Sequence, residues 1–304
     1  DELLKIAFGV WDHMKNYGNH GCENWTLDWV GFLPGKRESR RYRGAYVVNQ
    51  NDVEAGGQFE DTVAYAGWTM DDHFPEGFYY RGGHPTIYHP APTPWGLPYR
   101  CLYSVNIPNL YFAGRNISVT HTALSSSRVM GTCAILGQAV GTAVALAVQS
   151  GADNPRDVDV KKLQDALLWD DCMLPGFPRI PSEITKQAKT DYPMLKDGCD
   201  RDNPAEVLLG TVLSYEWDAP VFVEEVRFIF DSDLNRRKDN MPYNYPLNQP
   251  LYHLPETLVK EYKLIAVNEN GREIILADET KNRARMVRKT VNMNCRAVRL
   301  IPLA

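Results

Sequence analysis

The spacing of apolar and polar positions predicts a first part with helices and a second part made of strands. Residues 1–16 place apolar side chains three and four positions apart, which predicts an amphipathic helix. Residues 61–68 alternate as a strand does, and residues 129–149 form a long run rich in Ala, Gly, Val and Leu that predicts a second helix. Residues 157–171 repeat the helical spacing and predict a third.

The segments between these elements give weaker signals. Residues 25–32 and 42–48 read as strands, and residues 69–100 form a connection rich in Pro, Gly, His and aromatic residues with little regular pattern. Long connections of this kind are usually functional or lie over a neighbouring surface. Residues 172–192 contain several prolines, which predicts a linker without helix.

From residue 205 onward the pattern is that of strands, and no convincing helix interrupts it. Asn270-Gly271 is a strong hairpin signal between two of the strands. The long loop at residues 231–255 is rich in Asn, Pro and Tyr and suits a surface loop or a ligand rim. The expected strands are 207–217, 221–230, 259–267, 273–276, 285–291 and 297–300.

These elements predict an α+β or α/β domain followed by an all-β sandwich. We place the first domain at residues 1–175, the linker at 176–200 and the sandwich at 201–304. The length of 304 residues and the 44% share of hydrophobic residues agree with two domains that each bury a core.

Composition narrows the class of protein. A formal net charge of −5 gives no electrostatic reason to expect nucleic acid as a partner. The one long apolar run, 129–149, holds small and polar residues that favour a soluble core over a membrane span. The six cysteines are scattered without a C-x-x-C pair, which fits neither a zinc site nor a dense disulfide framework; one or two disulfides stay open, and so does the compartment.

Candidate chemistry is concentrated in residues 107–151. A short apolar run, 110–113, ends at Gly114, a polar loop at 115–128 carries His121, and the helix at 129–149 follows. Glycine lets backbone approach a ligand closely, and the amides at a helix N-terminus attract anions. Because most strand–loop–helix units bind nothing, the pattern alone leaves a cofactor site and a plain structural unit equally open.

Two further polar groups have both a functional and an ordinary interpretation. The run at residues 36–41 offers Arg37, Arg40 and Arg41 to a substrate carboxylate or a flavin phosphate, or is a solvated charge run. The connection at 69–100 holds acidic residues and histidines, but their spacing matches no metal-ligand rule, and we predict no metal site there. These residues are Asp71, Asp72, His73, His84 and His89.

Residues 109–118, NLYFAGRNIS, resemble the second flavin-contacting motif of FAD-dependent oxidoreductases. His121, Arg128 and Gly131 resemble more loosely a motif of the succinate dehydrogenase and fumarate reductase group, with extra residues between the histidine and the arginine. A family of bacterial FAD-dependent oxidoreductases, some labelled xanthan lyases, is the closer match over roughly residues 1–175. Its motifs are matched by residues 34–41, 59–65, 113–118 and 126–133.

The resemblance implies that FAD is the cofactor and that the substrate is small or sugar-derived. His121 would donate a hydrogen bond or transfer a proton, and Arg128 would neutralise reduced flavin or hold a substrate carboxylate. Each also has an ordinary interpretation: a loop histidine satisfied by backbone, and an arginine in a salt bridge at a helix start. The cofactor-binding residues that the resemblance implies are Ala113, Gly114, Arg115, Asn116, Gly131, Thr132 and Cys133.

The family's glycine-rich dinucleotide-binding unit does not occur in this sequence. The chain therefore resembles the C-terminal portion of such a protein, and we expect it not to retain FAD by itself. Gly137 and Gly141 lie four residues apart, which favours tight packing of the helix on a sheet over ligand binding.

Two alternative functions stay open at the level of sequence. Residues 201–304 weakly resemble a galactose-binding-like jelly roll, which would make them a carbohydrate-binding module. A polysaccharide lyase, as some relatives are labelled, would need a base and a cation beside a sugar groove. Residues that such a site could recruit are Tyr79, Tyr80, His84, His89 and Arg100.

Overall fold

The computed structural model describes residues 1–33, 35, 40–201, 203–234 and 254–304. The chain divides into two compact units, Asp1–Tyr42 and Arg43–Ala304, which we describe separately. Most of the predicted loop at 231–255 lies outside the described residues, as does Arg37 of the basic run.

The first unit is a helix followed by an extended segment. Helix α1 (Glu2–Asp12) continues into one π-helical turn, η1 (His13–Tyr17), as the helical spacing predicts. The Lys15 ammonium donates to the carbonyls of Cys22, Glu23 and Trp25, which folds the following loop back onto the helix end. The predicted strand at residues 25–32 is wrong, because this segment has no ladder partner among the described residues.

The second unit begins with short elements around two antiparallel strand pairs. Helix α2 (Gln50–Glu54) starts in a capping box, and β1 (Thr62–Ala66) pairs with β4 (Trp95–Pro98). Strands β2 (Met70–His73) and β3 (Thr86–His89) form the second pair. The stretch at 69–100 was expected to have little regular pattern and instead folds back on itself; two short 3-10 turns, Gly77–Tyr79 and Tyr99–Cys101, lie within or next to it.

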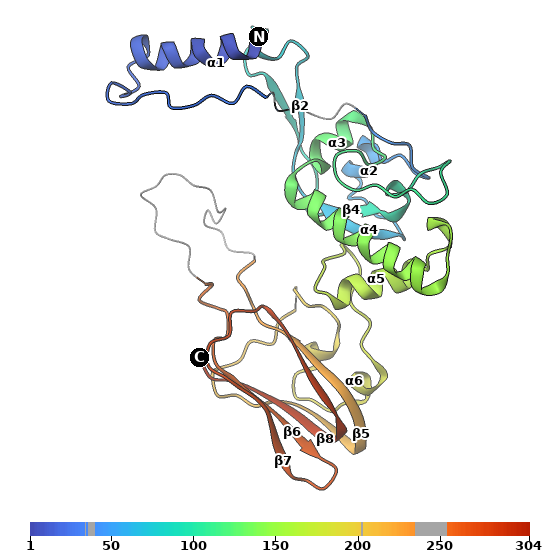
Figure 1. Cartoon of the computed structure of the whole chain (residues 1–304). Helices are drawn as coiled ribbons and strands as arrows, with labels where there is room; N and C mark the ends of the chain where they lie inside the picture. Colours follow the sequence, from blue (N-terminus) through green and yellow to red (C-terminus); the bar gives the residue numbers. More distant parts are fainter. Residues whose placement is uncertain (34, 36–39, 202, 235–253) are drawn as a thin grey trace. The chain divides into compact units, whose positions relative to one another are not determined.

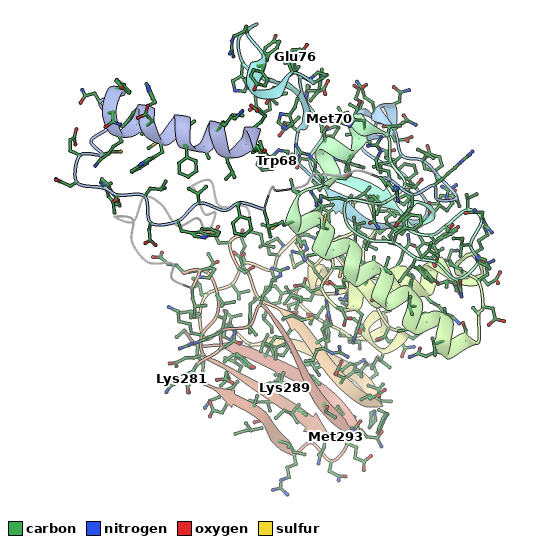
Figure 2. The ribbon with its side chains drawn as sticks, turned by 45° about the horizontal axis from the view of Figure 1, so that its top comes forward. Trp68, Met70, Glu76, Lys281, Lys289 and Met293 are labelled. Atoms are coloured by element: carbon green, nitrogen blue, oxygen red, sulfur yellow. The ribbon has the colours of Figure 1, made fainter. Side chains whose placement is uncertain are left out.

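Three helices complete this region: α3 (His121–Ser127), α4 (Met130–Ser150) and α5 (Val160–Trp169). In Figure 1, α3 lies beside β2, and α4 runs past β1 and β4 toward α5. The core buries Trp95, Leu136 and Leu163 completely, and Met70, at the start of β2, is also fully buried (Figure 2). The helices predicted at 129–149 and 157–171 are confirmed.

Two predicted strands form isolated β-bridges in place of regular ladders. Residues 42–48 hold only the bridges Gly44↔Ser104 and Val48↔Val119, and residues 110–113 hold only Tyr103↔Tyr111. These segments are extended and packed, but each meets its neighbour at one point, so no regular ladder forms.

Beyond α5 the chain enters an antiparallel sheet. The prediction that residues 172–192 contain no helix is wrong, because Ser182 caps the short helix α6 (Glu183–Gln187) and leaves Pro181 outside it. Within the described residues, the sheet has the order β5 (Leu213–Ile229), β8 (Met286–Pro302), β6 (Tyr262–Asn268) and β7 (Glu273–Glu279). The hairpin predicted at Asn270-Gly271 joins β6 to β7, with Gly271 at φ +79°.

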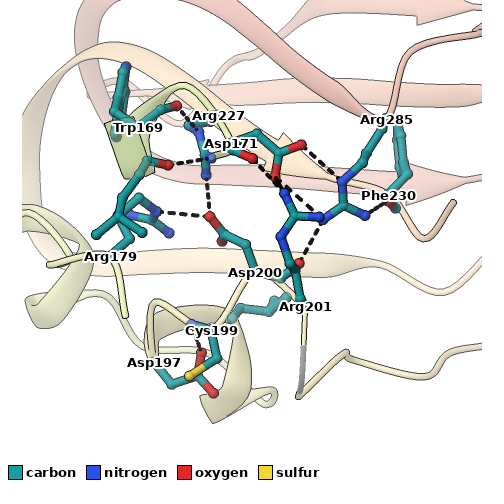
Figure 3. Close-up of polar contacts among 12 residues, drawn as sticks. Trp169, Asp171, Arg179, Asp197, Cys199, Asp200, Arg201, Arg227, Phe230 and Arg285 are labelled. Atoms are coloured by element: carbon teal, nitrogen blue, oxygen red, sulfur yellow. Dashed lines mark hydrogen bonds and ion pairs between the residues drawn. The ribbon is translucent and has the colours of Figure 1, made fainter. Parts of the chain in front are cut away.

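Charged side chains, most of them partly buried, link the end of α5 to the sheet (Figure 3). Asp171, just past α5, pairs with Arg285 at 2.9 Å and with Arg201 at 3.1 Å. Arg227 on β5, whose side chain is only 3% exposed, pairs with Asp200 at 3.0 Å and donates to the Trp169 carbonyl. Because charges this buried are stable only when paired, the network constrains where β5 and β8 meet α5.

The structure also bears on the six cysteines and on the long apolar helix α4. All six cysteines are free thiols. By length and composition alone, α4 is the one helix among the described residues that could cross a membrane, and 28% of its apolar window is buried.

Candidate functional site

The candidate site is built from β2, α3, the loop before α3 and the start of α4. The sequence predicts an irregular polar loop over 115–128, but its second half is helix α3. The Thr120 side chain caps this helix by accepting from the Ala123 amide, and Ala123 and Leu124 are buried. Two apolar residues that pack inward are enough to make a short helix of an otherwise polar sequence.

Buried hydrogen bonds fix α3 in place. The Trp95 indole N–H on β4 donates to the Ser126 hydroxyl at 3.0 Å, and Ser126 in turn donates to the Trp68 carbonyl. Trp95 and Ser126 are both fully buried. This chain of bonds joins β4, α3 and Trp68, two residues before β2, so the polar ends of α3 have defined positions.

His121, the first residue of α3, faces the acidic side chain of Asp72 on β2. Its Nε2 lies 3.9 Å from Asp72 Oδ1, and the two side chains are 61% and 47% exposed. The imidazole thus lies next to a carboxylate, and both side chains are open to solvent. The structure therefore gives His121 an acidic neighbour that sequence reasoning did not assign to it.

Arg128 ends α3 and contacts His73, the next residue along β2. Its terminal nitrogen lies 3.1 Å from His73 Nε2, while His73 Nδ1 lies 2.8 Å from the Thr86 hydroxyl on β3. A guanidinium has no acceptor, so His73 Nε2 must accept and its proton sits on Nδ1. Arg128 thus contacts a neutral histidine that the β2–β3 pair orients.

The loop before α3 contains polar atoms with no protein partner. Gly114 has φ +95°, a conformation that L side chains rarely adopt. The Asn116 carboxamide oxygen and the Ser118 hydroxyl are buried and accept or donate no hydrogen bond within the described part of the chain. Buried polar atoms in folded proteins normally have partners, so these two atoms offer hydrogen-bonding positions to a ligand or a water.

The start of α4 is open and uncapped. Its N-cap residue, Val129, supplies no side-chain bond, and Met130 is 89% exposed. A Cβ added to Gly131 would meet no atom within 4 Å, while Thr132 is buried. The amides of this first turn are therefore available to an anion or a carbonyl oxygen.

Cys133 connects this helix start to the loop. Its thiol donates to the Arg128 carbonyl at 3.6 Å. Burial raises the pKa of the Cys133 thiol, and the positive charge of Arg115 lowers it in part. Arg115 and Cys133, both predicted cofactor residues, are therefore near enough for the charge of one to act on the other.

The remaining predicted residues are the cations of the basic run and two glycines of α4. Arg40 and Arg41 are exposed in the first unit, so the structure leaves their predicted role with the substrate untested. Gly137 and Gly141 are exposed, and a Cβ at either would meet nothing within 4 Å, so the prediction of tight helix–sheet packing is wrong for the described chain.

Arg100, the cation that a lyase site would recruit, is already paired with a carboxylate. Arg100 makes a two-point contact with Asp61, at 3.0 Å through both Nε and a terminal nitrogen. That bond raises the pKa of Arg100, and its guanidinium also lies over the Tyr46 ring. Among the residues that the structure describes, no group of three or more His, Cys, Asp or Glu is arranged to hold a metal ion.

The site lies in a region of mixed helices and short strands that precedes an antiparallel sheet, which defines a protein of one α/β part and one β part. The family profile described as "FAD dependent oxidoreductase" matches residues 1–167, more than half of the chain. The chain belongs to the FAD-dependent oxidoreductase family. No curated protein matches the chain.

Parts of the chain are also similar to solved carbohydrate-binding structures. CpGH89CBM32-4 of Clostridium perfringens in selenomethionine form shows 9% identity and a TM-score of 0.20, over 32% of this chain and 57% of that chain. The same protein in complex with GlcNAc-α-1,4-galactose shows 10% identity and a TM-score of 0.25, over 40% of this chain and 79% of that chain.

The family 32 carbohydrate-binding module of Streptococcus pneumoniae EndoD shows 13% identity and a TM-score of 0.21, over 31% of this chain and 56% of that chain. Similarity at this level assigns neither a fold nor a ligand to residues 201–304.

Proposed function

We propose that this chain forms one wall of the FAD site and the substrate site of an oxidoreductase that acts on a small or sugar-derived substrate. Family membership supports the class of reaction. The single observation in the structure that carries the proposal is the pair of buried, unpartnered polar atoms, Asn116 Oδ1 and Ser118 Oγ, on the loop that matches the flavin-contacting motif.

The residues present fit a flavin. FAD offers N–H and hydroxyl donors and carbonyl acceptors, which match an orphaned amide oxygen, an orphaned hydroxyl and an uncapped helix start. The open backbone at Gly114 and Gly131 leaves room for close approach. The loop residues Ala113, Gly114, Arg115 and Asn116 and the helix residues Gly131, Thr132 and Cys133 would hold the cofactor.

When bound, FAD supplies the two-electron chemistry. The residues of this chain supply charge and protons beside it. Arg128 offers a permanent positive charge that holds a substrate carboxylate, and His73 fixes the direction of the guanidinium. His121, next to Asp72, accepts or returns a proton at Nε2. These roles place His121 and Arg128 as catalytic residues and His73 as a positioning residue.

Ser118→Ala tests the proposed cofactor contact in the protein of natural length. Because the Ser118 hydroxyl has no bond in the described chain, its removal leaves the unfolding midpoint unchanged or slightly raised. If the hydroxyl binds FAD, the variant holds flavin more weakly, by roughly tenfold in dissociation constant. Ser127→Ala is the control, since among the described residues the Ser127 hydroxyl bonds only to the Ala123 carbonyl in its own helix.

Visible absorbance and released-flavin fluorescence give the flavin-to-protein ratio. A protein of natural length that purifies without flavin and takes up none on titration would refute the proposal. So would a Ser118→Ala, Asn116→Leu double variant that binds FAD as tightly as the parent.

As a second candidate function, we propose that residues 201–304 form a galactose-binding-like jelly roll that binds saccharides. The observation in its favour is an exposed aromatic on an edge strand, because Phe222 on β5 is 59% exposed. Aromatic faces stack on the apolar faces of sugar rings. Glycan-array binding by the whole chain that is lost in Phe222→Ala supports this function, and binding unchanged in that variant contradicts it.

A further inference from the structure

A cavity of about 520 Å³ lies between helix α5 and residues 179–186, away from the candidate flavin site. Asp165 and Trp169 contribute to it from α5, and Arg179, Ile180 and Glu183 contribute from the segment that leads into α6. The volume is within the range of small-ligand pockets, roughly 300–1,000 Å³. None of these residues has a part in the function proposed above.

The wall formed by Trp169 and Arg179 is held firmly. Guanidinium groups of Arg179, Arg227 and Arg288 lie 5.9, 5.4 and 5.5 Å from the centre of the Trp169 ring. Arg179 Nε also pairs with Asp200 at 3.4 Å, as Figure 3 shows. These contacts fix the indole and the guanidinium before any ligand arrives, which lowers the entropic cost of binding.

The backbone at Arg179 is equally constrained. Its amide donates to the Gly198 carbonyl at 3.0 Å. Gly198 has φ +79°, and a Cβ placed there would lie within 1.9 Å of the Arg179 carbonyl oxygen. Only glycine permits this close approach, so the position of Arg179 is determined by the fold and not by a flexible loop.

Several polar groups of the cavity wall are left without protein partners. Within the described chain, the Trp169 indole N–H and the two terminal nitrogens of Arg179 make no hydrogen bond, and none of these atoms is buried. The Asp165 carboxylate likewise has no hydrogen bond or ion pair to a described residue and is exposed on α5. The cavity thus offers donors from Trp169 and Arg179 and a strong acceptor from Asp165.

The remaining lining adds apolar surface and balances the charge. Ile180 is 65% exposed, and Pro181 lies next to it. Two cations, Arg179 and Lys186, face two carboxylates, Asp165 and Glu183, and Lys186 already pairs with Glu183 at 2.7 Å. A lining without net charge gives no advantage to a polyanion such as a nucleotide.

We infer that this cavity binds an uncharged saccharide of one or two rings. Neighbouring sugar hydroxyls donate and accept at once, so they match a carboxylate acceptor and a planar guanidinium donor together. The apolar face of a sugar ring matches Ile180 and Pro181. The inference is independent of the FAD site and of the saccharide binding proposed at Phe222, because the groups that would contact the sugar lie in residues 165–186.

Titration of the whole chain with galactose, N-acetylglucosamine and cellobiose, followed by calorimetry or by NMR shifts of the Trp169 indole N–H, tests the inference. We expect binding of at least one of these sugars, weakened at least tenfold by Asp165→Ala. Since Asp165 has no partner in the described chain, this variant keeps the parent's unfolding midpoint. Arg179→Lys, which keeps the charge but loses the planar pair of donors, is expected to weaken binding to a similar degree.

Asp153→Ala, an exposed aspartate outside the cavity, is the matched control and leaves binding unchanged. Phe222→Ala separates this site from one on the sheet and also leaves the Asp165-dependent binding unchanged. The inference fails if no uncharged sugar binds at millimolar concentration. It also fails if binding survives both cavity variants, or if only sugars with a carboxylate bind.

Discussion

Arg128 and His73, which are 55 residues apart in the sequence, contact each other at 3.1 Å between a guanidinium nitrogen and imidazole Nε2. The contact joins the end of α3 to the end of β2, and it requires His73 to be neutral with its proton on Nδ1. Arg128, which resembles a flavoprotein substrate residue, is therefore positioned by the β2–β3 strand pair. The sequence did not predict this pair.

Arg128→Ala should lower kcat/KM in the protein of natural length by roughly 10- to 100-fold, the range expected for losing a charged hydrogen bond to a substrate carboxylate. Arg128→Lys should recover part of that loss. Steady-state kinetics measures the effect, and thermal unfolding reports on stability. Arg272→Ala, on an exposed hairpin, is the control. Wild-type kinetics in Arg128→Ala would remove this residue from the mechanism.

Ser126→Ala should destabilise the chain by about 1–3 kcal/mol, because it leaves the buried Trp95 indole N–H without an acceptor. Urea unfolding measures the loss. Ser127→Ala serves for comparison, since that buried hydroxyl bonds only within α3, and we expect a smaller cost. Equal costs for the two variants would show that the Trp95–Ser126 bond does not anchor α3.

Gly137→Ala and Gly141→Ala should each stabilise the isolated chain by about 0.5–1 kcal/mol. Both glycines lie inside α4, where glycine is unfavourable, and a Cβ at either position meets no atom within 4 Å. Urea midpoints of the single variants and of the pair measure the gain. A loss of stability in either variant would reveal a close contact on this face of α4.

The chain should lose stability in alkaline solution, in part through Tyr215. Burial raises the pKa of Tyr215 to about 12 from its ordinary value of 10.0. The unfolded chain therefore releases this proton first, so the stability from Tyr215 is complete below pH 10 and is lost as the pH rises toward 12.

Tyr215→Phe should make the free energy of unfolding fall less steeply with rising pH. Near neutral pH the variant should be less stable by about 1 kcal/mol, because it loses the hydrogen bond to the Leu195 carbonyl. Urea midpoints measured from neutral to strongly alkaline pH give the slope. Tyr17→Phe, at an exposed position, is the control and keeps the parent's slope. An unchanged slope in Tyr215→Phe would contradict the assignment.

Local sequence signals predicted the elements whose formation depends on near neighbours. The small-residue run that becomes α4 and the Asn270-Gly271 turn between β6 and β7 are examples. The β2–β3 pair escaped prediction because its four residues per strand carry no clear alternation, and its register, Met70 opposite His89, exists only once the chain folds back. Helix α3 escaped because its stability comes from buried contacts of Ala123, Leu124 and Ser126.

The sequence by itself determined the family, through motifs such as residues 113–118 and 126–133, because a cofactor loop needs particular residues at fixed spacing. It also predicted His121 and Arg128 as the residues of the candidate chemistry. Only the tertiary structure decided their partners, Asp72 and His73, since those lie on a strand about 50 residues earlier that contacts α3 after folding. It likewise revealed the unpartnered Asn116 and Ser118 atoms and the cavity beside Trp169, because burial and cavity shape depend on how side chains pack and not on their spacing in the sequence.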